Sequence, residues 1–503
     1  MCGIIGIINS NTKEYVSSDL VLGLNMLQHR GQDSTGIYTL HNNIFHSHKN
    51  LGLIGQVYNA ENIHQLKGNI GIGHVRYSTA GSINMEQTQP LYTSFPYGIA
   101  LVHNGNITNS EDIRKELVLE NRHVNSDSDS EVLLNLFANE LNNVNYLMKN
   151  QHIDTEHEHI FEVVKRVFTK CKGGYSVVII VNNIGTIAFR DPHGIRPLSF
   201  GIRKNKWNIP SIGGTGLYGS KNASGENDYI FASENIAIDK TYKSVRNVLP
   251  SECIFINSKY EMYNKRLIDT AILSPCLFEY IYFARPDSCI DGILVYEARI
   301  RMGICLGKKI KRLIDTNENN DLSDIDVVIP VPETSRSAGL YVAQEINKPY
   351  REGFIKNNYI PRTFIMPDQA SRIKNISLKL NTISSEFIGK NVLIVDDSIV
   401  RGNTSKQLIQ LARDAGAKKI YFASLAPPVK YSNKYGIAIP TRKELVAYNK
   451  NDNEISEILG ADCVIYNDLE DVIKTCKELN PTISCFETSC FDGIYIFTIK
   501  YIK

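Results

Sequence analysis

Short runs of apolar residues recur along the chain and are separated by longer segments with helical spacing. The first run covers residues 2–8, where only isoleucine and glycine follow Cys2. The next segment places leucines at the spacing of one helix face: Leu20, Leu24 and Leu27. Because a buried strand reads as a short apolar run and a helix as a repeat of three or four residues, the chain is predicted to open with a strand and a helix.

The second half of the chain alternates buried-type strands with helical segments. The predicted strands cover residues 325–330, 391–396, 420–424 and 462–466. A parallel pair of strands needs a crossover connection, which is usually a helix, so this alternation favours a parallel sheet. We therefore predict an α/β domain with a doubly wound parallel sheet.

Length and composition limit the possible classes of protein. The chain has 503 residues, a net charge of +2, 43% hydrophobic residues and 21% charged residues. This length accommodates two or more domains, which we expect at residues 2–245 and 246–503. The near-neutral charge argues against an obligate nucleic-acid-binding protein. No apolar run approaches ~18 residues, and the start lacks a basic leader, so we expect a cytoplasmic protein without a membrane span.

Cys2 is a candidate nucleophile because it directly follows the initiator methionine. Removal of that methionine would leave a thiol and a free α-amine on one residue. The reference pKa of the thiol is about 8.5 and that of the amine about 7.7 to 8, so the amine can act as a general base near neutrality. A cysteine in an apolar strand is also often a small core residue. On position alone, the small core residue is the favoured interpretation.

Four further motifs follow Cys2 before residue 132. They are HRGQDSTG at 29–36, GHVRYST at 73–79, LVHNGNI at 101–107 and SDSE at 128–131. In this order and spacing they resemble the glutamine amidotransferase domain of the N-terminal-nucleophile hydrolases. The resemblance implies a four-layer αββα sandwich, which the periodicity does not predict by itself.

The resemblance also implies a role for each motif in glutamine hydrolysis. Arg76 would clamp the substrate carboxylate with its planar guanidinium, and Asp129 would pair with the α-ammonium. The Asn104 side chain and the Gly105 backbone N–H would stabilise the oxyanion formed by thiolate attack. Arg30 would favour the thiolate and order the site. Arg76 as a surface charge and Asp129 as a helix cap remain the ordinary alternatives.

A second set of candidate residues follows the predicted strand at 391–396. Asp396 and Asp397 end this strand, and adjacent carboxylates there can bind two ribose hydroxyls. The backbone N–H groups of residues 398–404 open a helix and can hold a 5-phosphate. The side chains and glycine that we assign to this loop are Ser398, Arg401, Gly402 and Thr404. No Gly-Lys-Ser/Thr is present, which excludes a Walker loop, so a phosphoribosyl site at the carboxyl ends of parallel strands is predicted.

Two other segments would complete this site. The strand at 325–330 leads into Glu333, Thr334 and Ser335, whose N–H and hydroxyl groups can bind a pyrophosphate and its Mg2+. The basic, poorly periodic segment at 356–379 is interpreted as a lid that excludes water. A solvated surface helix is the alternative for this segment.

Together, these motifs make the whole chain resemble the amidophosphoribosyltransferase family, the glutamine phosphoribosylpyrophosphate (PRPP) amidotransferases. The resemblance runs from Cys2 to about residue 496. It implies that glutamine, PRPP and water give 5-phosphoribosylamine, pyrophosphate and glutamate, the first step of purine synthesis. Ammonia released at Cys2 must then reach the ribose without meeting water, which calls for an apolar channel.

The same resemblance implies further properties of the second site and of the assembly. Tyr359, Arg362 and Lys379 would lie in the lid. Ser335, Asp396 and Asp397 would hold Mg2+. Purine nucleotides would act as feedback inhibitors, and the chain would form a homotetramer. No nucleic-acid or membrane partner is expected.

One branch of this family holds an iron–sulfur cluster on four cysteines. The matching positions in this sequence are Ile236, Asn433, Glu487 and Cys490. Because three of these four positions are not cysteine, we expect no iron–sulfur cluster. With Cys2 at the start, we also expect the branch without a propeptide.

Three other functions are alternatives for this sequence. Glucosamine-6-phosphate synthase shares the first domain, but it normally has tyrosine where Gln32 stands and has a sugar isomerase as its second half. Asparagine synthetase would need the loop Ser-Gly-Gly-x-Asp-Ser, which is missing. A phosphoribosyl-binding regulator would bind ligand without releasing glutamate, and the intact set of amidotransferase motifs argues against it.

Overall fold

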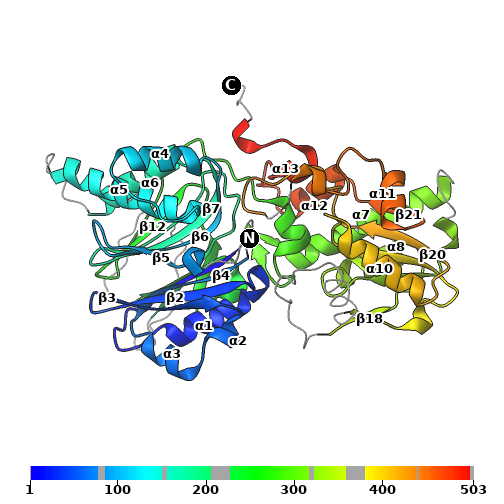
Figure 1. The fold of residues 1–503 in the computed structure, drawn as a ribbon, viewed down its shortest axis with the longest axis horizontal. Coiled ribbons are helices and arrows are strands. Elements are labelled where there is room, and N and C mark those ends of the chain that lie inside the picture. The colour runs from blue at the N-terminus through cyan, green and yellow to red at the C-terminus, as the bar shows by residue number, and fades with distance from the viewer. Residues whose placement is uncertain are drawn as a thin grey trace. The chain divides into compact units, whose positions relative to one another are not determined.

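The computed structural model describes residues 2–77, 85–149, 156–204, 227–316, 322–357, 380–437, 439 and 441–498. The chain divides into two compact units. The first comprises Met1–Pro275 together with Lys434–Ala438, and the second comprises Cys276–Asn433 and Ile439–Lys503. Figure 1 shows the elements of both units, coloured along the chain.

The first unit contains two antiparallel sheets. The seven-stranded sheet has the order β11-β9-β10-β1-β4-β2-β3, and the six-stranded sheet has the order β13-β12-β8-β7-β6-β5. The strands of the first sheet are β1 (Gly3–Ile8), β2 (Ser34–His41), β3 (Ile44–Leu51), β4 (Ile70–Arg76), β9 (Ser199–Lys204), β10 (Asn227–Ala232) and β11 (Lys243–Asn247). Those of the second are β5 (Leu91–Thr93), β6 (Ile99–Ile107), β7 (Gly173–Val181), β8 (Gly185–Arg190), β12 (Glu252–Asn257) and β13 (Met262–Arg266).

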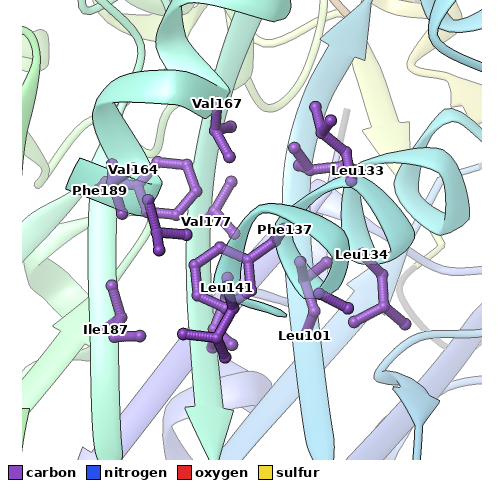
Figure 2. Packing of buried hydrophobic residues seen from close by; sticks show 14 of the residues in the cluster. Leu101, Leu133, Leu134, Phe137, Leu141, Val164, Val167, Val177, Ile187 and Phe189 are labelled. Atoms are coloured by element: carbon purple, nitrogen blue, oxygen red, sulfur yellow. The ribbon is translucent and has the colours of Figure 1, made fainter. Parts of the chain in front are cut away.

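Helices cover the outer face of each sheet. The helices on the first sheet are α1 (Ser17–Met26), α2 (Ile54–Val57) and α3 (Ala60–Gln65), and those on the second are α4 (Ser110–Leu119), α5 (Asp129–Lys149) and α6 (Glu156–Lys170). Figure 2 shows Phe137 and Leu141 of α5 packed over Leu101 and Val177 of the second sheet. The four layers are therefore helices, sheet, sheet and helices.

The strand β1 shows why the apolar periodicity of the sequence did not predict this architecture. Ile5 and Ile7 pack against the helices, whereas Ile4 and Ile8 pack against the second sheet. Because both faces of β1 are buried, the strand reads as a continuous apolar run without polar alternation. The αββα sandwich implied by the family resemblance is confirmed.

The first unit extends further along the chain than the expected division near residue 245. β12 pairs with β8 in the second sheet, and β13 pairs with β12. These strands need the sheet for their backbone hydrogen bonds, so they belong to the sandwich. The division consequently falls at Pro275.

The second unit is built on a four-stranded parallel sheet with the order β16-β19-β20-β21. Its strands are β16 (Val327–Pro330), β19 (Asn391–Asp396), β20 (Lys419–Ser424) and β21 (Cys463–Tyr466), which confirms the four predicted strands. Its helices are α7 (Val295–Thr316), α8 (Arg336–Glu345), α10 (Asn403–Asp414), α11 (Asp452–Leu459), α12 (Leu469–Leu479) and α13 (Ser489–Asp492). Two small antiparallel sheets of two strands pair β14 (Cys289–Ile290) with β15 (Ile293–Leu294), and β17 (Phe354–Lys356) with β18 (Leu380–Thr382).

Both faces of the parallel sheet are buried. Val392 and Ile394 pack with Leu408 of α10 in one hydrophobic cluster, and Leu393 and Val395 on the opposite face are fully buried as well. This double burial explains why the strands read as unbroken apolar runs. Of the helices in the described ranges, none combines the length and the apolar character needed to cross a bilayer.

Candidate active site

Cys2 lies at the start of β1, and its backbone is fixed on both sides. The Cys2 N–H donates to Asn104 Oδ1 at 3.0 Å, which connects the first sheet to β6 of the second. The Cys2 carbonyl accepts a hydrogen bond from Arg30 Nε at 3.0 Å. Further along the strand, the Ile4 N–H donates to the Ser233 hydroxyl at 2.9 Å. The nucleophile candidate therefore sits on a backbone with little freedom.

Arg30 is held by a buried carboxylate. Its guanidinium is 2.5 Å from Glu234 Oε1, and both side chains are fully buried. His29 Nε2 lies 2.7 Å from the same oxygen. Sequence reasoning missed this role of Glu234, because 204 residues separate it from Arg30 and no local motif connects them.

Asn104 and Gly105 lie on β6 beside Cys2. Because Asn104 Oδ1 accepts the Cys2 N–H, the amide nitrogen points elsewhere: Asn104 Nδ2 is buried and meets no acceptor among the described residues. A buried donor without a partner is costly, so this group is suited to an acceptor brought by a ligand. Such a donor next to a nucleophile is the arrangement that stabilises an oxyanion.

Arg76 ends β4 next to Cys2. The register pairs Gly3 with Val75, so its continuation brings Arg76 opposite Cys2. Arg76 NH2 donates to Gln87 Oε1, while Arg76 NH1 is buried and meets no acceptor in the described part of the chain. Gln87, which orients Arg76, is a second residue that sequence reasoning missed.

Asp129 begins α5 and lies at the end of β6. Its Oδ2 accepts the Ile107 N–H at 2.9 Å and is 3.9 Å from His103 Nδ1. His103 Nδ1 is also 2.8 Å from the Ser130 hydroxyl. Burial lowers the pKa of His103, against a smaller opposing effect of Asp129. The lowered pKa favours the neutral form of His103, which directly precedes Asn104 on β6.

In the second unit, the structure brings together the residues that follow β16 and β19. Thr334 donates to Asp397 Oδ2, and the Ser335 hydroxyl is 3.5 Å from Asp396 Oδ1. The Ser398 hydroxyl donates to Asp397 Oδ1 at 2.7 Å. Two segments that are distant in sequence therefore form one polar cluster at the carboxyl ends of neighbouring parallel strands.

The two carboxylates of this cluster are buried close together. Burial raises the pKa of Asp396 well above its usual value, and the adjacent Asp397 carboxylate adds to the shift. Burial also raises the pKa of Asp397. Two buried carboxyl groups side by side favour a cation or hydroxyl donors, because either would relieve the repulsion that arises when both are ionised.

The oxygens of Ser335, Asp396 and Asp397 are hard ligands of the kind that Mg2+ prefers. Within the described ranges, no group of three or more His, Cys, Asp or Glu side chains converges on a possible metal position. A Mg2+ ion at the acidic pair would therefore take further oxygens from hydroxyls, water or substrate phosphates, which is its usual mode of binding.

The loop after Asp397 turns into α10 through a glycine. Gly402 precedes the helix with a φ of +77°, and a Cβ atom there would lie 2.7 Å from Leu459 Cδ2. Only glycine adopts this conformation without strain or collision. Thr404 lies in the first turn of α10, so the loop that ends at Gly402 leads directly into the N-terminus of this helix.

Two expected ligand side chains form ion pairs with other protein groups. Glu333 Oε2 is 2.6 Å from Arg336 in the first turn of α8, and Arg401 is 3.5 Å from Glu444. All four of these side chains are substantially exposed. Three expected lid residues lie outside the described residues: Tyr359, Arg362 and Lys379.

The positions matched to cluster ligands in the iron–sulfur branch carry ordinary protein interactions where they are described. Asn433 Nδ2 donates to Glu487 Oε2 at 3.3 Å. Cys490 is buried, and burial raises the pKa of its thiol.

Comparison with known proteins identifies relatives that match almost the whole chain. A family model described as a glutamine amidotransferase domain matches residues 74–212. The amidophosphoribosyltransferase of Pasteurella multocida is 46% identical over 99% of this chain and 93% of its own length. Those of Escherichia coli and Saccharomyces cerevisiae are 46% and 42% identical over 99% of this chain, and 92% and 93% of their own lengths.

Solved structures show the same similarity. The glutamine PRPP amidotransferase from B. subtilis, complexed with ADP and GMP, superimposes with a TM-score of 0.78 at 33% identity. That match covers 98% of this chain and 97% of the other. Similarity of this extent in both sequence and fold shows that the chain belongs to the amidophosphoribosyltransferase family.

Proposed function

We propose that the chain converts glutamine, PRPP and water into 5-phosphoribosylamine, pyrophosphate and glutamate, as the first step of purine synthesis. Family membership over almost the full length supports the reaction. The observation that carries it is that one chain holds two separate polar sites, one around Cys2 and Asn104 and one around Asp396 and Asp397. The groups of each site support one half of the proposed reaction.

In the first half-reaction, the Cys2 thiolate adds to the side-chain amide of glutamine. The α-amine of Cys2 takes the thiol proton and passes it to the leaving ammonia. Asn104 Oδ1 accepts the N–H of Cys2 in the structure, and after removal of Met1 the same contact would orient the lone pair of the amine. Water then hydrolyses the thioester, which releases glutamate and restores the thiol.

The other groups of this site bind the substrate and its oxyanion. Asn104 Nδ2 and the Gly105 N–H stabilise the oxyanion of the tetrahedral intermediate. The buried NH1 of Arg76 supports a role in binding the glutamine carboxylate, because it meets no acceptor among the described residues. Asp129 pairs with the α-ammonium, and Arg30 fixes the Cys2 carbonyl.

In the second half-reaction, ammonia attacks C1 of the ribose and displaces pyrophosphate. Asp396 and Asp397 accept hydrogen bonds from the ribose hydroxyls, which their shared burial favours. Ser335, Asp396 and Asp397 would hold Mg2+, which when bound supplies positive charge to the leaving pyrophosphate. The remaining PRPP-binding and lid residues of this proposal are Glu333, Thr334, Tyr359, Arg362, Lys379, Ser398, Arg401, Gly402 and Thr404.

Further parts of the proposal concern transfer, regulation and assembly. Ammonia passes between the two sites without meeting water, since protonation would end its nucleophilicity. Purine nucleotides inhibit the enzyme, which the ADP and GMP bound in the B. subtilis structure support. A homotetramer and a cytoplasmic location follow from the family resemblance.

The first test measures glutamate release from glutamine with Mg2+, in the presence and absence of PRPP, together with pyrophosphate release. We expect both products to appear together and PRPP to stimulate glutamine hydrolysis. Glutamate without pyrophosphate would contradict the proposal and favour a second unit that only senses its ligand. Binding of PRPP with neither product would identify a regulator without turnover.

A further inference from the structure

Residues 434–437 belong to a different compact unit from the residues that precede and follow them in the sequence. Asn433 and Ile439 belong to the second unit, whereas Lys434–Ala438 belongs to the first. Within the first unit, Asn106 Nδ2 donates to the Lys434 carbonyl at 2.8 Å. Tyr435, Gly436 and Ile437 are buried. The segment is thus an integral part of the amidotransferase unit, although the chain reaches it only after most of the second unit.

Gly436 packs directly against the backbone of Gly105. A Cβ atom on Gly436 would lie 2.8 Å from the Gly105 carbonyl carbon and 2.9 Å from its Cα and its oxygen. No side-chain rotation could relieve these contacts, because all three atoms are backbone. The close approach therefore requires glycine at position 436.

Gly105 is also confined on its other side. Its φ is +147°, and a Cβ atom on Gly105 would lie 2.0 Å from the Gly174 carbonyl oxygen of β7. Tyr435 of the 434–437 segment packs on Gly174 of β7, because a Cβ atom on Gly174 would lie 3.2 Å from Tyr435 Cβ. The backbone of Gly105 is consequently held between β7 and the 434–437 segment.

This confinement matters because an oxyanion donor must be in place before the reaction. Donors act at about 2.7 to 3.1 Å from the oxyanion, and displacements of roughly 0.5 Å reduce their effect. A backbone N–H has no rotamer with which to adjust, so its position depends on what packs around its peptide group. Gly436 packs on the Cα and the carbonyl group of Gly105, and this Cα is directly bonded to the nitrogen that carries the N–H.

We infer that Gly436 is a positioning residue for glutamine hydrolysis: its bare backbone fixes Gly105 and with it the oxyanion-binding N–H. The inference rests on the proposed function of Gly105. It assigns to the 434–437 segment a part in the chemistry at Cys2 that no motif around Cys2 indicates.

The test compares Gly436→Ala with Gly389→Ala. Gly389 has a φ of +70°, and a Cβ atom there would meet nothing within 4 Å, so this control carries backbone strain without a collision. We expect Gly436→Ala to lower kcat for glutamine hydrolysis by about 10- to 100-fold with KM for glutamine changed less than about twofold, because an oxyanion donor acts mainly in the transition state. Ammonia-dependent synthesis should be unchanged in both variants.

Other results would overturn the inference. An unchanged kcat in folded Gly436→Ala, or a raised KM with kcat retained, would mean that the segment does not position the oxyanion donor. Equal loss of ammonia-dependent activity would indicate a general defect instead. If the unaltered enzyme released no glutamate, the proposed function itself would fail, which is a distinguishable result.

A second variant tests the inference without adding bulk. Asn106→Ala removes the hydrogen bond to the Lys434 carbonyl and keeps both glycines. We expect a smaller decrease in the same kcat, roughly fivefold, as for loss of one ordinary hydrogen bond. Wild-type kcat for this variant, together with wild-type kcat for Gly436→Ala, would exclude a positioning role for the segment.

Discussion

The backbone of Cys2 is positioned by side chains that lie far away in sequence. Asn104 binds its N–H, Arg30 binds its carbonyl, and Glu234 fixes Arg30. The carboxylate of Glu234 is fully buried and is shared with His29. A buried ion pair of this kind depends on both partners, because removal of one leaves an uncompensated charge.

Replacement of Glu234 by glutamine should therefore affect both stability and glutamine hydrolysis. We expect a loss of about 3 kcal/mol in the free energy of unfolding and a decrease of roughly tenfold or more in kcat with glutamine, because Arg30 would lose its fixed position. Urea unfolding and steady-state kinetics measure the two effects. The matched control is Glu158→Gln, which breaks a half-exposed pair with Lys265 and should change stability by less than about 1 kcal/mol. Equal behaviour of the two variants would contradict the role of Glu234.

At Asp396 and Asp397, the proposed function lowers the stability of the fold, whereas Glu234 is expected to support both stability and function. Because burial raises the pKa of Asp396 in the folded protein above that in the unfolded chain, Asp396 lowers the stability of the fold at neutral pH. This penalty is complete above the folded-state pKa and decreases as the pH falls toward the usual value of the unfolded chain. The proposed binding role of Asp396 therefore comes at a cost in stability.

Asp396→Asn should consequently stabilise the substrate-free enzyme at neutral pH, by about 1 kcal/mol, while removing synthesis with either glutamine or ammonia. Asparagine keeps an oxygen for the Asp397 N–H, which the wild-type carboxylate accepts at 2.9 Å. Thermal unfolding from pH 7.5 down to pH 5 should show the advantage of the variant shrinking as pH falls. A variant less stable than the wild type at pH 7.5 would contradict this account.

At the scale of elements, the sequence was informative where neighbouring residues determine structure. The four parallel strands were predicted closely, because apolar runs buried on both faces are bounded by polar loops. The sandwich could not be predicted from periodicity, since Ile4 and Ile5 of β1 face different layers and are both apolar. The junction was expected too early, because β12 and β13 gain their partners only from the folded second sheet.

The candidate sites follow the same rule. Pairs adjacent in sequence, such as Asn104 with Gly105 and Asp396 with Asp397, could be proposed from motifs. Glu234 and Gln87 could not, because their contacts with Arg30 and Arg76 exist only after folding. A sequence pattern gives the type of each residue and its neighbours along the chain. The residues that hold a site residue in place are defined by their distance in space, which a single sequence does not give.

The loop before α10 provides a prediction at this scale. Gly402→Ala should raise KM for PRPP by about tenfold, because the new Cβ would collide with Leu459 and shift the loop. Glutamine hydrolysis without PRPP should be unaffected. The control is Gly460→Ala, with a similar φ of +79° but no atom nearer than 4.0 Å. If both variants raise KM equally, backbone strain and not the collision is responsible.

At the scale of the whole molecule, the proposed reaction assigns one half-reaction to each unit. Cys2 and Asn104 belong to the antiparallel sandwich, and Asp396 and Asp397 belong to the parallel domain. The chemistry of each unit requires no side chain from the other, but ammonia must be transferred between them. The two activities should therefore be separable by substitution.

Cys2→Ala should abolish glutamine-dependent synthesis and retain synthesis from PRPP with high ammonia. Asp396→Asn combined with Asp397→Asn should abolish synthesis from both nitrogen sources, while glutamine hydrolysis without PRPP persists. Product formation from each nitrogen source measures these effects. Loss of ammonia-dependent synthesis in a folded Cys2→Ala enzyme would contradict the assignment of two sites.

The path of the chain through residues 434–437 has a genetic consequence. A gene fragment ending at Pro275 would encode both sheets of the sandwich but not the residues that pack on Gly105. A fragment starting at Cys276 would encode Tyr435 and Gly436 without the β6 backbone that they contact. The residues of the amidotransferase unit are therefore encoded in two separate portions of the gene, so that a single crossover at the domain junction would not transfer glutamine hydrolysis intact.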